Sequence, residues 1–93
     1  MFSWDPQKAI VNFEKHGVSV EEAATVFADT EGLDWEDLTH SDYETRYRRL
    51  GISVERNVLL VVYTIRRTGD GKETIRIISA RQASRKERKS YSR

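Results

Sequence analysis

Arginine is the side chain whose number and placement in this sequence most strongly suggest chemistry. Residues 46–93 hold 14 of the 16 Lys and Arg, and 11 of these 14 are Arg. With four acids, this half has a formal charge of +10, whereas residues 1–45, with 11 acids and two lysines, have −9. The planar guanidinium suits bidentate contacts with phosphate, and such a charge asymmetry indicates nucleic acid or a partner of opposite charge. Alternatively, the two halves fold together and neutralise each other.

Titrating side chains are the next candidates for a catalytic role. His16 is the foremost, since imidazole ordinarily titrates between pH 5 and 8, although a cation at that position also fits the end of a helix before Gly17. His40 precedes an acidic loop and ranks below it. Glu44 either acts as a base or pairs with a neighbouring arginine, Arg46 or Arg48, and pairing is favoured.

Metal chemistry is not expected from this sequence. There is no cysteine, and the two histidines form neither an HxH nor an HExxH spacing, so a zinc site is not predicted. The acids between Asp29 and Asp37 fall in one local segment, which fits a solvated loop better than a magnesium cluster assembled from several elements.

Aromatic side chains offer a possible surface for base stacking. Tyr63, Tyr47 and Trp4 are the candidates, with core packing favoured for Trp4. Alternation along a strand places Tyr63 on the face opposite Thr64 and Arg66 unless a bulge intervenes. Thr64 and Arg66 are therefore the favoured site pair.

The element that must position these residues is the apolar run Val58–Tyr63. Six consecutive apolar residues predict a central strand buried on both faces, and the run is too short to cross a bilayer. The turn residues from Arg67 to Lys72 predict an antiparallel hairpin into a second strand, Glu73–Ser79. Arg76 then stands on a sheet face, where a basic side chain either pairs with an acid or binds an anion.

Two helices are predicted before the sheet. After a short strand at residues 2–4, Asp5 and Pro6 begin a helix that ends at Gly17, and a capping box at Ser19–Glu22 begins the second. The residues expected to be buried are Ala9, Ile10 and Phe13 in the first helix and Val20, Ala23, Ala24 and Phe27 in the second.

The remaining segments complete the predicted order β-α-α-β-β-β-β-α. Strands are expected at Leu33–Glu36 and Arg46–Val54, where Gly51 indicates a bulge or a close backbone approach, and a basic helix is expected from Ala80 onward. With 93 residues and 38% hydrophobic content, we predict a single α+β domain over residues 1–93. Its antiparallel sheet has a two-helix hairpin on one face and a C-terminal basic helix.

The compartment expected from the sequence is the cytoplasm. The absence of cysteine excludes disulfides and suits a reducing environment, and residues 1–6 contain neither a basic n-region nor an apolar h-region. No membrane association is predicted.

Several ordered sequence words resemble the BrnT family of ribonuclease toxins from type II toxin–antitoxin modules, which are similar in fold to RelE toxins. Tyr43 stands where the family usually has glycine, which affects the local turn. The words are Phe2-x-Trp4-Asp5, Lys15-His16-Gly17-Val18, Glu21-Glu22-Ala23, Val26-Phe27-x-Asp29, Glu44-x-Arg46, Val62-Tyr63-Thr64-x-Arg66 and Ile75-Arg76-Ile77-Ile78-Ser79-Ala80-Arg81.

The resemblance implies metal-independent RNA cleavage without a cofactor. It also implies neutralisation by a ribbon-helix-helix antitoxin, BrnA, and contact with operator DNA only through the antitoxin complex. Cleavage without a metal needs a base for the 2′-hydroxyl, an acid for the leaving 5′-oxygen and cations for the charged phosphorane.

The residues assigned to these tasks form two predicted groups. The catalytic candidates are His16, Glu44, Arg46, Thr64, Arg66 and Arg81, and the RNA-binding candidates are Lys15, Arg76, Arg85, Lys86 and Arg88. Two other functions remain open: a nucleic-acid-binding module without catalysis, and a protein-interaction domain whose acidic and basic halves bind a partner.

Overall fold

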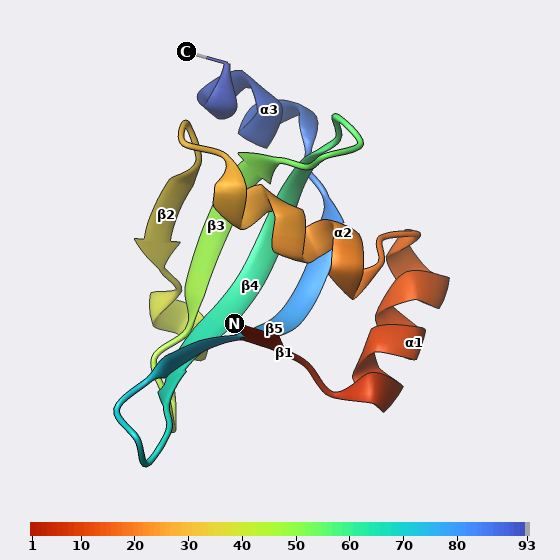
Figure 1. Cartoon of the computed structure of the whole chain (residues 1–93). Helices are drawn as coiled ribbons and strands as arrows, with labels where there is room; N and C mark the ends of the chain where they lie inside the picture. The colour runs from red at the N-terminus through yellow and green to blue at the C-terminus, as the bar shows by residue number, and fades with distance from the viewer. Residues whose placement is uncertain (93) are drawn as a thin grey trace.

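A five-stranded sheet in the order β1-β5-β4-β3-β2 forms the centre of the molecule (Figure 1). A computed structural model describes residues 1–92. The strands are β1 (Phe2–Ser3), β2 (Leu33–Glu36), β3 (Tyr47–Ile52), β4 (Val58–Arg67) and β5 (Glu73–Gln82), and the helices are α1 (Pro6–His16), α2 (Val20–Thr25) and α3 (Arg85–Tyr91), with short 3₁₀ turns η1 (Val26–Ala28) and η2 (Leu38–His40). The predicted α+β class and element order are confirmed.

One strand pairing differs from the predicted antiparallel sheet. β1 pairs with β5 in parallel, with Phe2 opposite Ile75 and Ser3 opposite Arg76, whereas all other neighbours are antiparallel. β1 continues into α1 rather than into a hairpin, so no tight turn constrains its direction. The sheet is therefore mostly, not wholly, antiparallel.

β4 is the central strand, and its apolar run is buried on both faces as predicted. Leu60 faces a small cluster with Leu50 and Ala83 beneath α3, and all three side chains are at most 5% exposed. Leu59 and Val61 face the larger core on the α2 side, whose other buried members are Val18, Val20, Ala23, Val26, Ile77 and Ala80.

β5 contains a bulge at Ile78. The register of the β4–β5 pairing shifts there, because Ile77 and Ser79, on either side of Ile78, lie opposite the consecutive residues 63 and 62 of β4. The extra residue changes the alternation of side chains, so Ile77 and Ala80 both face the α2-side core. Arg76 and Arg81 consequently both lie on the opposite face of the sheet.

The basic helix begins later than predicted. Ala80 is buried within β5, which continues to Gln82, so the expected helix start at Ala80 is wrong. Ser84 is the N-cap of α3. Its hydroxyl accepts from the backbone N–H of Glu87 at 3.1 Å, and the Glu87 carboxylate accepts in turn from the backbone N–H of Ser84 at 2.8 Å. Among residues 1–92, no helix is long and apolar enough to span a membrane.

α1 lies beside the β5 edge of the sheet, and α2 crosses one face (Figure 1). The predicted burial of Ile10 and Phe13 is wrong, since they are 61% and 55% exposed. Asn12 is buried instead. Its amide donates to the backbone carbonyls of Ala80 at 2.9 Å and Val18 at 3.2 Å and accepts from the Ala80 N–H at 3.1 Å. An asparagine faces the sheet here because the exposed strand edge presents polar backbone groups that must be paired.

α2 has only half of the predicted capping box. The Ser19 hydroxyl accepts from the Glu22 backbone N–H at 3.0 Å. The Glu22 carboxylate accepts instead from the Ser53 hydroxyl at 2.6 Å and the Asn57 amide at 2.9 Å. This carboxylate therefore fixes the β3–β4 turn against α2.

β3 is shorter than predicted, but Gly51 allows the close backbone approach that was predicted for it. A side-chain carbon added at Gly51 would lie 3.2 Å from both Cβ and the carbonyl oxygen of Val26. The close backbone approach between β3 and η1 is confirmed, and β2 lies where it was predicted.

We expect Asn12→Ala to lower the free energy of unfolding by about 2–3 kcal/mol, because buried backbone groups of Ala80 lose their partner. Urea unfolding followed by circular dichroism measures this. Glu14→Ala, on the exposed side of the same helix, is the control and should change stability by less than about 0.5 kcal/mol. Equal effects of the two substitutions would contradict this role for Asn12.

Candidate active site

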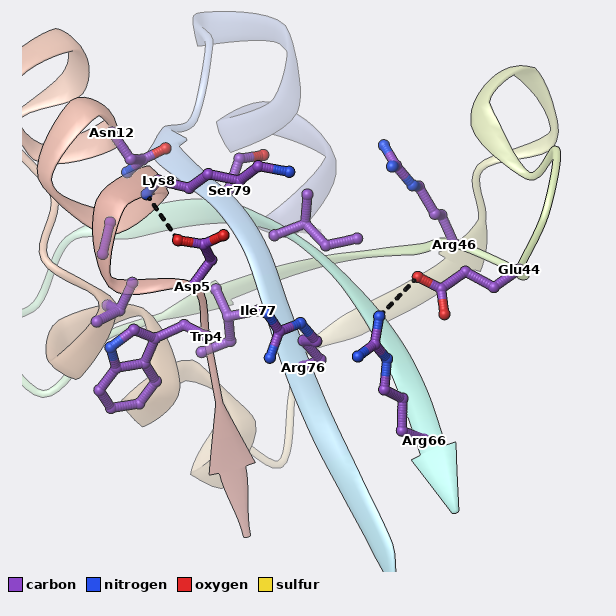
Figure 2. A pocket seen from close by; sticks show the side chains of 13 residues that line it. Trp4, Asp5, Lys8, Asn12, Glu44, Arg46, Arg66, Arg76, Ile77 and Ser79 are labelled. Atoms are coloured by element: carbon purple, nitrogen blue, oxygen red, sulfur yellow. Dashed lines mark hydrogen bonds and ion pairs between the residues drawn. The ribbon is translucent and has the colours of Figure 1, made fainter. Parts of the chain in front are cut away.

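Three predicted arginines line one hollow. Arg46 immediately precedes β3, Arg66 lies near the end of β4, and Arg76 stands on β5, and together they border a hollow of about 130 Å³ (Figure 2). Within residues 1–92, neither Arg46 nor Arg76 has a carboxylate partner within 4 Å. Their charges are therefore available to an anion. We call this hollow the arginine groove.

The start of α1 forms the other wall of the arginine groove. Trp4, Asp5 and Lys8 line it together with Ser79 of β5. The Asp5 carboxylate caps α1, accepting from the backbone N–H groups of Gln7 at 2.9 Å and Lys8 at 3.3 Å. Lys8 is a site residue that the sequence analysis missed, since only the position of α1 beside β5 reveals it.

The loop of residues 37–46 extends the arginine groove. A second hollow, of about 440 Å³, shares three residues with the first and adds three from this loop. The shared residues are Glu44, Arg46 and Arg66, and the added residues are His40, Asp42 and Tyr43.

Three hydrogen bonds close this loop on itself, and a fourth holds it against β4. The Asp37 N–H donates to the Arg46 carbonyl at 2.8 Å, while the Ser41 hydroxyl donates to the Asp37 carbonyl at 2.7 Å and accepts from the Arg46 N–H at 3.0 Å. The Thr64 hydroxyl donates to the Thr45 carbonyl at 2.8 Å. Because Thr64 is 2% exposed, this geometry favours a positioning role over the direct catalytic role predicted for it.

Glu44 pairs with an arginine, as the sequence favoured, but with a different one. Its carboxylate lies 3.3 Å from the Arg66 guanidinium rather than beside Arg46 or Arg48. Arg66 and Glu44 are 52% and 41% exposed, and an ion pair so exposed contributes little to stability. Both groups can therefore exchange this partner for another charged group.

Arg81 does not join the arginine groove. Its guanidinium forms a bidentate pair with Glu87, with nitrogen–oxygen distances of 2.8 and 3.0 Å. Arg81 is opposite Leu60 and Arg66 is opposite Thr74, so six residues of β4, about 20 Å, separate them along the strand. The prediction that Arg81 gathers with the other arginines is wrong, since α3 supplies its own carboxylate.

The remaining predicted cations lie farther from the arginine groove. Lys15 and His16 line a hollow along α1 that meets the groove at Lys8 and Ser79. They also form the last helical turn before Gly17, whose φ of 70° ends α1. α3 lies at the other end of the sheet (Figure 1). Its predicted RNA-binding side chains are exposed, and their RNA contacts stay a prediction; they are Arg85, Lys86 and Arg88.

The predicted aromatic platforms are mostly committed to the core. Tyr63 is 7% exposed, stacks on Tyr47 at 5.5 Å between ring centroids, and donates its hydroxyl to Asp34 at 2.8 Å. Trp4 packs against the core and borders the arginine groove. Tyr43, which is fully exposed in the second hollow, was missed because no local pattern distinguishes a loop tyrosine.

The fold and the groove define a small α+β protein with a cationic surface suited to a polyanion. Residues 4–87 match the family described as ribonuclease toxin, BrnT, of type II toxin–antitoxin system, and the chain belongs to this family. The crystal structure of the ribonuclease toxin BrnT from Brucella abortus is similar, with 22% identity and a TM-score of 0.61 over 91% of this chain and 99% of that one. No functionally curated protein sequence matches the chain.

We expect the Arg81–Glu87 pair to contribute stability that acid removes. The hydrogen bond from Arg81 is the largest cause that lowers the pKa of Glu87 from 4.5 to about 2. A lowered folded pKa stabilises the protein above pH 4.5, and this stabilisation disappears as the pH falls toward 2. Glu87→Gln should therefore be less stable than the natural protein at pH 7, with a difference that shrinks between pH 5 and 2.

Urea unfolding at a series of pH values measures this difference. Glu73→Gln is the matched control, because its ion pair with Arg67 is exposed on both sides and should matter little at any pH. A Glu87→Gln difference that stays constant across the range would contradict the assigned pairing.

Proposed function

We propose that this chain is a metal-independent endoribonuclease that inhibits translation by cutting RNA. The observation that carries the proposal is the gathering of Arg46, Arg66 and Arg76 around one hollow beside Glu44. Membership in a ribonuclease toxin family supports the substrate class. Among residues 1–92, no three His, Cys, Asp or Glu side chains form a group that could hold a metal ion.

The proposed step is attack of a ribose 2′-oxygen on the adjacent phosphorus. The 2′-O–P bond forms and the P–O5′ bond breaks with its electron pair on the 5′-oxygen, which takes up a proton. The products are a 2′,3′-cyclic phosphate and a 5′-hydroxyl. Glu44 takes the proton of the 2′-hydroxyl once the phosphate has replaced it as the partner of Arg66. The three arginines stabilise the charge that develops on the phosphorane oxygens.

The proposed partner is a ribbon-helix-helix antitoxin encoded with the toxin, through which the pair would contact operator DNA. A type II module consists of a toxin and a cognate protein antitoxin, and the family assignment carries this inference. The antitoxin needs only to cover the arginine groove to prevent cleavage.

A nucleic-acid-binding module without catalysis is the second candidate. The exposed cations of α3, away from the groove, favour it because they suit phosphate binding without a reacting centre. This alternative predicts affinity that falls steeply with salt and no cleavage, whereas a protein-interaction domain predicts no RNA affinity at moderate salt.

We expect Arg66→Ala and Arg76→Ala each to slow RNA cleavage in EDTA by about 10²–10³-fold, the cost of removing one electrostatic donor from a charged transition state. Gel separation of labelled RNA fragments over time measures the rate. Arg67→Ala is the matched control: it neighbours Arg66 on the same strand but pairs with Glu73 on the other face, and its rate should stay within a few-fold of the natural protein.

Two outcomes would contradict the proposal. RNA that is bound but never cut would favour the module without catalysis, and equal losses in Arg66→Ala and Arg67→Ala would show that general positive charge, not the arginine groove, governs the reaction.

A further inference from the structure

His40 is oriented by a buried carboxylate at the edge of the arginine groove. Its Nδ1 lies 3.1 and 3.3 Å from the two carboxylate oxygens of Asp37. Asp37 is 6% exposed, whereas His40 is 56% exposed and lines the second hollow. One ring nitrogen is therefore held by the protein, and Nε2 is left for a ligand in the hollow.

The state of Asp37 fixes the tautomer of His40. Burial alone would raise the pKa of the Asp37 carboxyl, but hydrogen bonds from His40 and Arg48 outweigh burial and lower it. An ionised carboxylate only accepts hydrogen bonds, so Nδ1 must carry a proton, and Nε2 is the ring nitrogen left for a ligand. Arg48 holds the same carboxylate from β3, with its Nε 3.2 Å from Asp37.

The chain's other histidine has no comparable partner within residues 1–92. His16 ends α1 and lines a hollow without carboxylates. His40 instead shares its hollow with the proposed base and two phosphate-binding arginines. The charged groups that face it from the loop, β3 and β4 are Asp37, Asp42, Glu44, Arg46, Arg48 and Arg66.

We propose that His40 is the general acid of the RNA cleavage and that Asp37 is its positioning residue. This inference rests on the proposed ribonuclease function and deepens it. As the P–O5′ bond breaks, Nε2 of the doubly protonated imidazole gives its proton to the leaving 5′-oxygen, and the ring becomes neutral with Nδ1–H still on Asp37. Glu44 meanwhile holds the proton of the 2′-hydroxyl. The electron pair of the broken bond stays on that oxygen, so the 5′-hydroxyl product leaves neutral.

The first experiment compares His40→Asn with the natural protein under single-turnover conditions in EDTA. Loss of a general acid should slow cleavage by about 10²–10³-fold, with RNA affinity changed only a few-fold because the arginines remain. His40 is largely exposed, so the variant should fold, and thermal unfolding verifies this. A cleavage rate within a few-fold of the natural protein would overturn the proposal.

The second experiment separates the acid from the base. RNA whose 5′-bridging oxygen is replaced by sulfur has a leaving group that departs as a thiolate and needs no proton. His40→Asn should cut this substrate within a few-fold of the natural protein, whereas Glu44→Gln should stay slow on both substrates. A His40→Asn variant that is equally slow on both substrates would show that His40 does not supply the leaving-group proton.

A third experiment tests the positioning role of Asp37. Asp37→Asn should slow cleavage of ordinary RNA by roughly 10-fold or more and shift its pH–rate profile, yet leave cleavage of the sulfur substrate nearly unchanged. Glu36→Gln removes a neighbouring charge that is exposed on β2 and should do neither. Equal effects of the two substitutions would overturn the role of Asp37.

The first two experiments also distinguish failure of this proposal from failure of the ribonuclease function on which it rests. A natural protein that cuts neither substrate would overturn both the ribonuclease function and the general acid. A natural protein that cuts ordinary RNA, together with an equally active His40→Asn variant, would overturn the general acid alone.

Discussion

The pairing of β4 with β5 determines both the core and the arginine groove. Ile77 and Ala80 are separated by three positions, so a regular strand would send them to opposite faces. The bulge at Ile78 places both in the core and leaves Arg76 and Arg81 on the other face. A regular register would instead bury a guanidinium or expose apolar surface, and an unpaired buried charge is the more costly of the two. Core packing therefore fixes the face on which the arginines stand.

The loop of residues 37–46 depends on the same strand. Thr64 is buried beside the groove, and its hydroxyl holds the Thr45 carbonyl of the loop. Asp37, Ser41 and Arg46 then close the loop through their backbone and side-chain hydrogen bonds. The sheet thus positions Glu44 and His40, although neither belongs to a strand. Buried polar contacts of this kind set the geometry of a site whose functional side chains are exposed.

The sequence predicted the features that local rules control. The apolar run of β4 and the turn after Arg67 can each be recognised from residues that are neighbours in the sequence. Asn12 could not be foreseen, because its partner Ala80 lies 68 residues away and a polar residue on a helix normally indicates the solvent side. The sequence analysis ranked His16 above His40 without the contact between His40 and Asp37, because that contact exists only once the loop has closed. Arg81 was expected among the catalytic arginines, but it pairs with Glu87, which lies beside it because α3 begins only at Arg85.

Folding neutralises part of the charge asymmetry of the chain. The part that is less well neutralised bears on the proposed function. Among residues 1–92, three ion pairs join the acidic half to the basic half: Asp34 with Arg49, Asp37 with Arg48 and Glu44 with Arg66. The first two have one nearly buried partner each and stabilise the β2–β3 side. The third is exposed on both sides, so solvent screens it and a phosphate can displace the carboxylate. Of the three pairs, the one in the arginine groove is therefore the weakest. In the proposed mechanism, entry of a phosphate there would free Glu44 to act as the base.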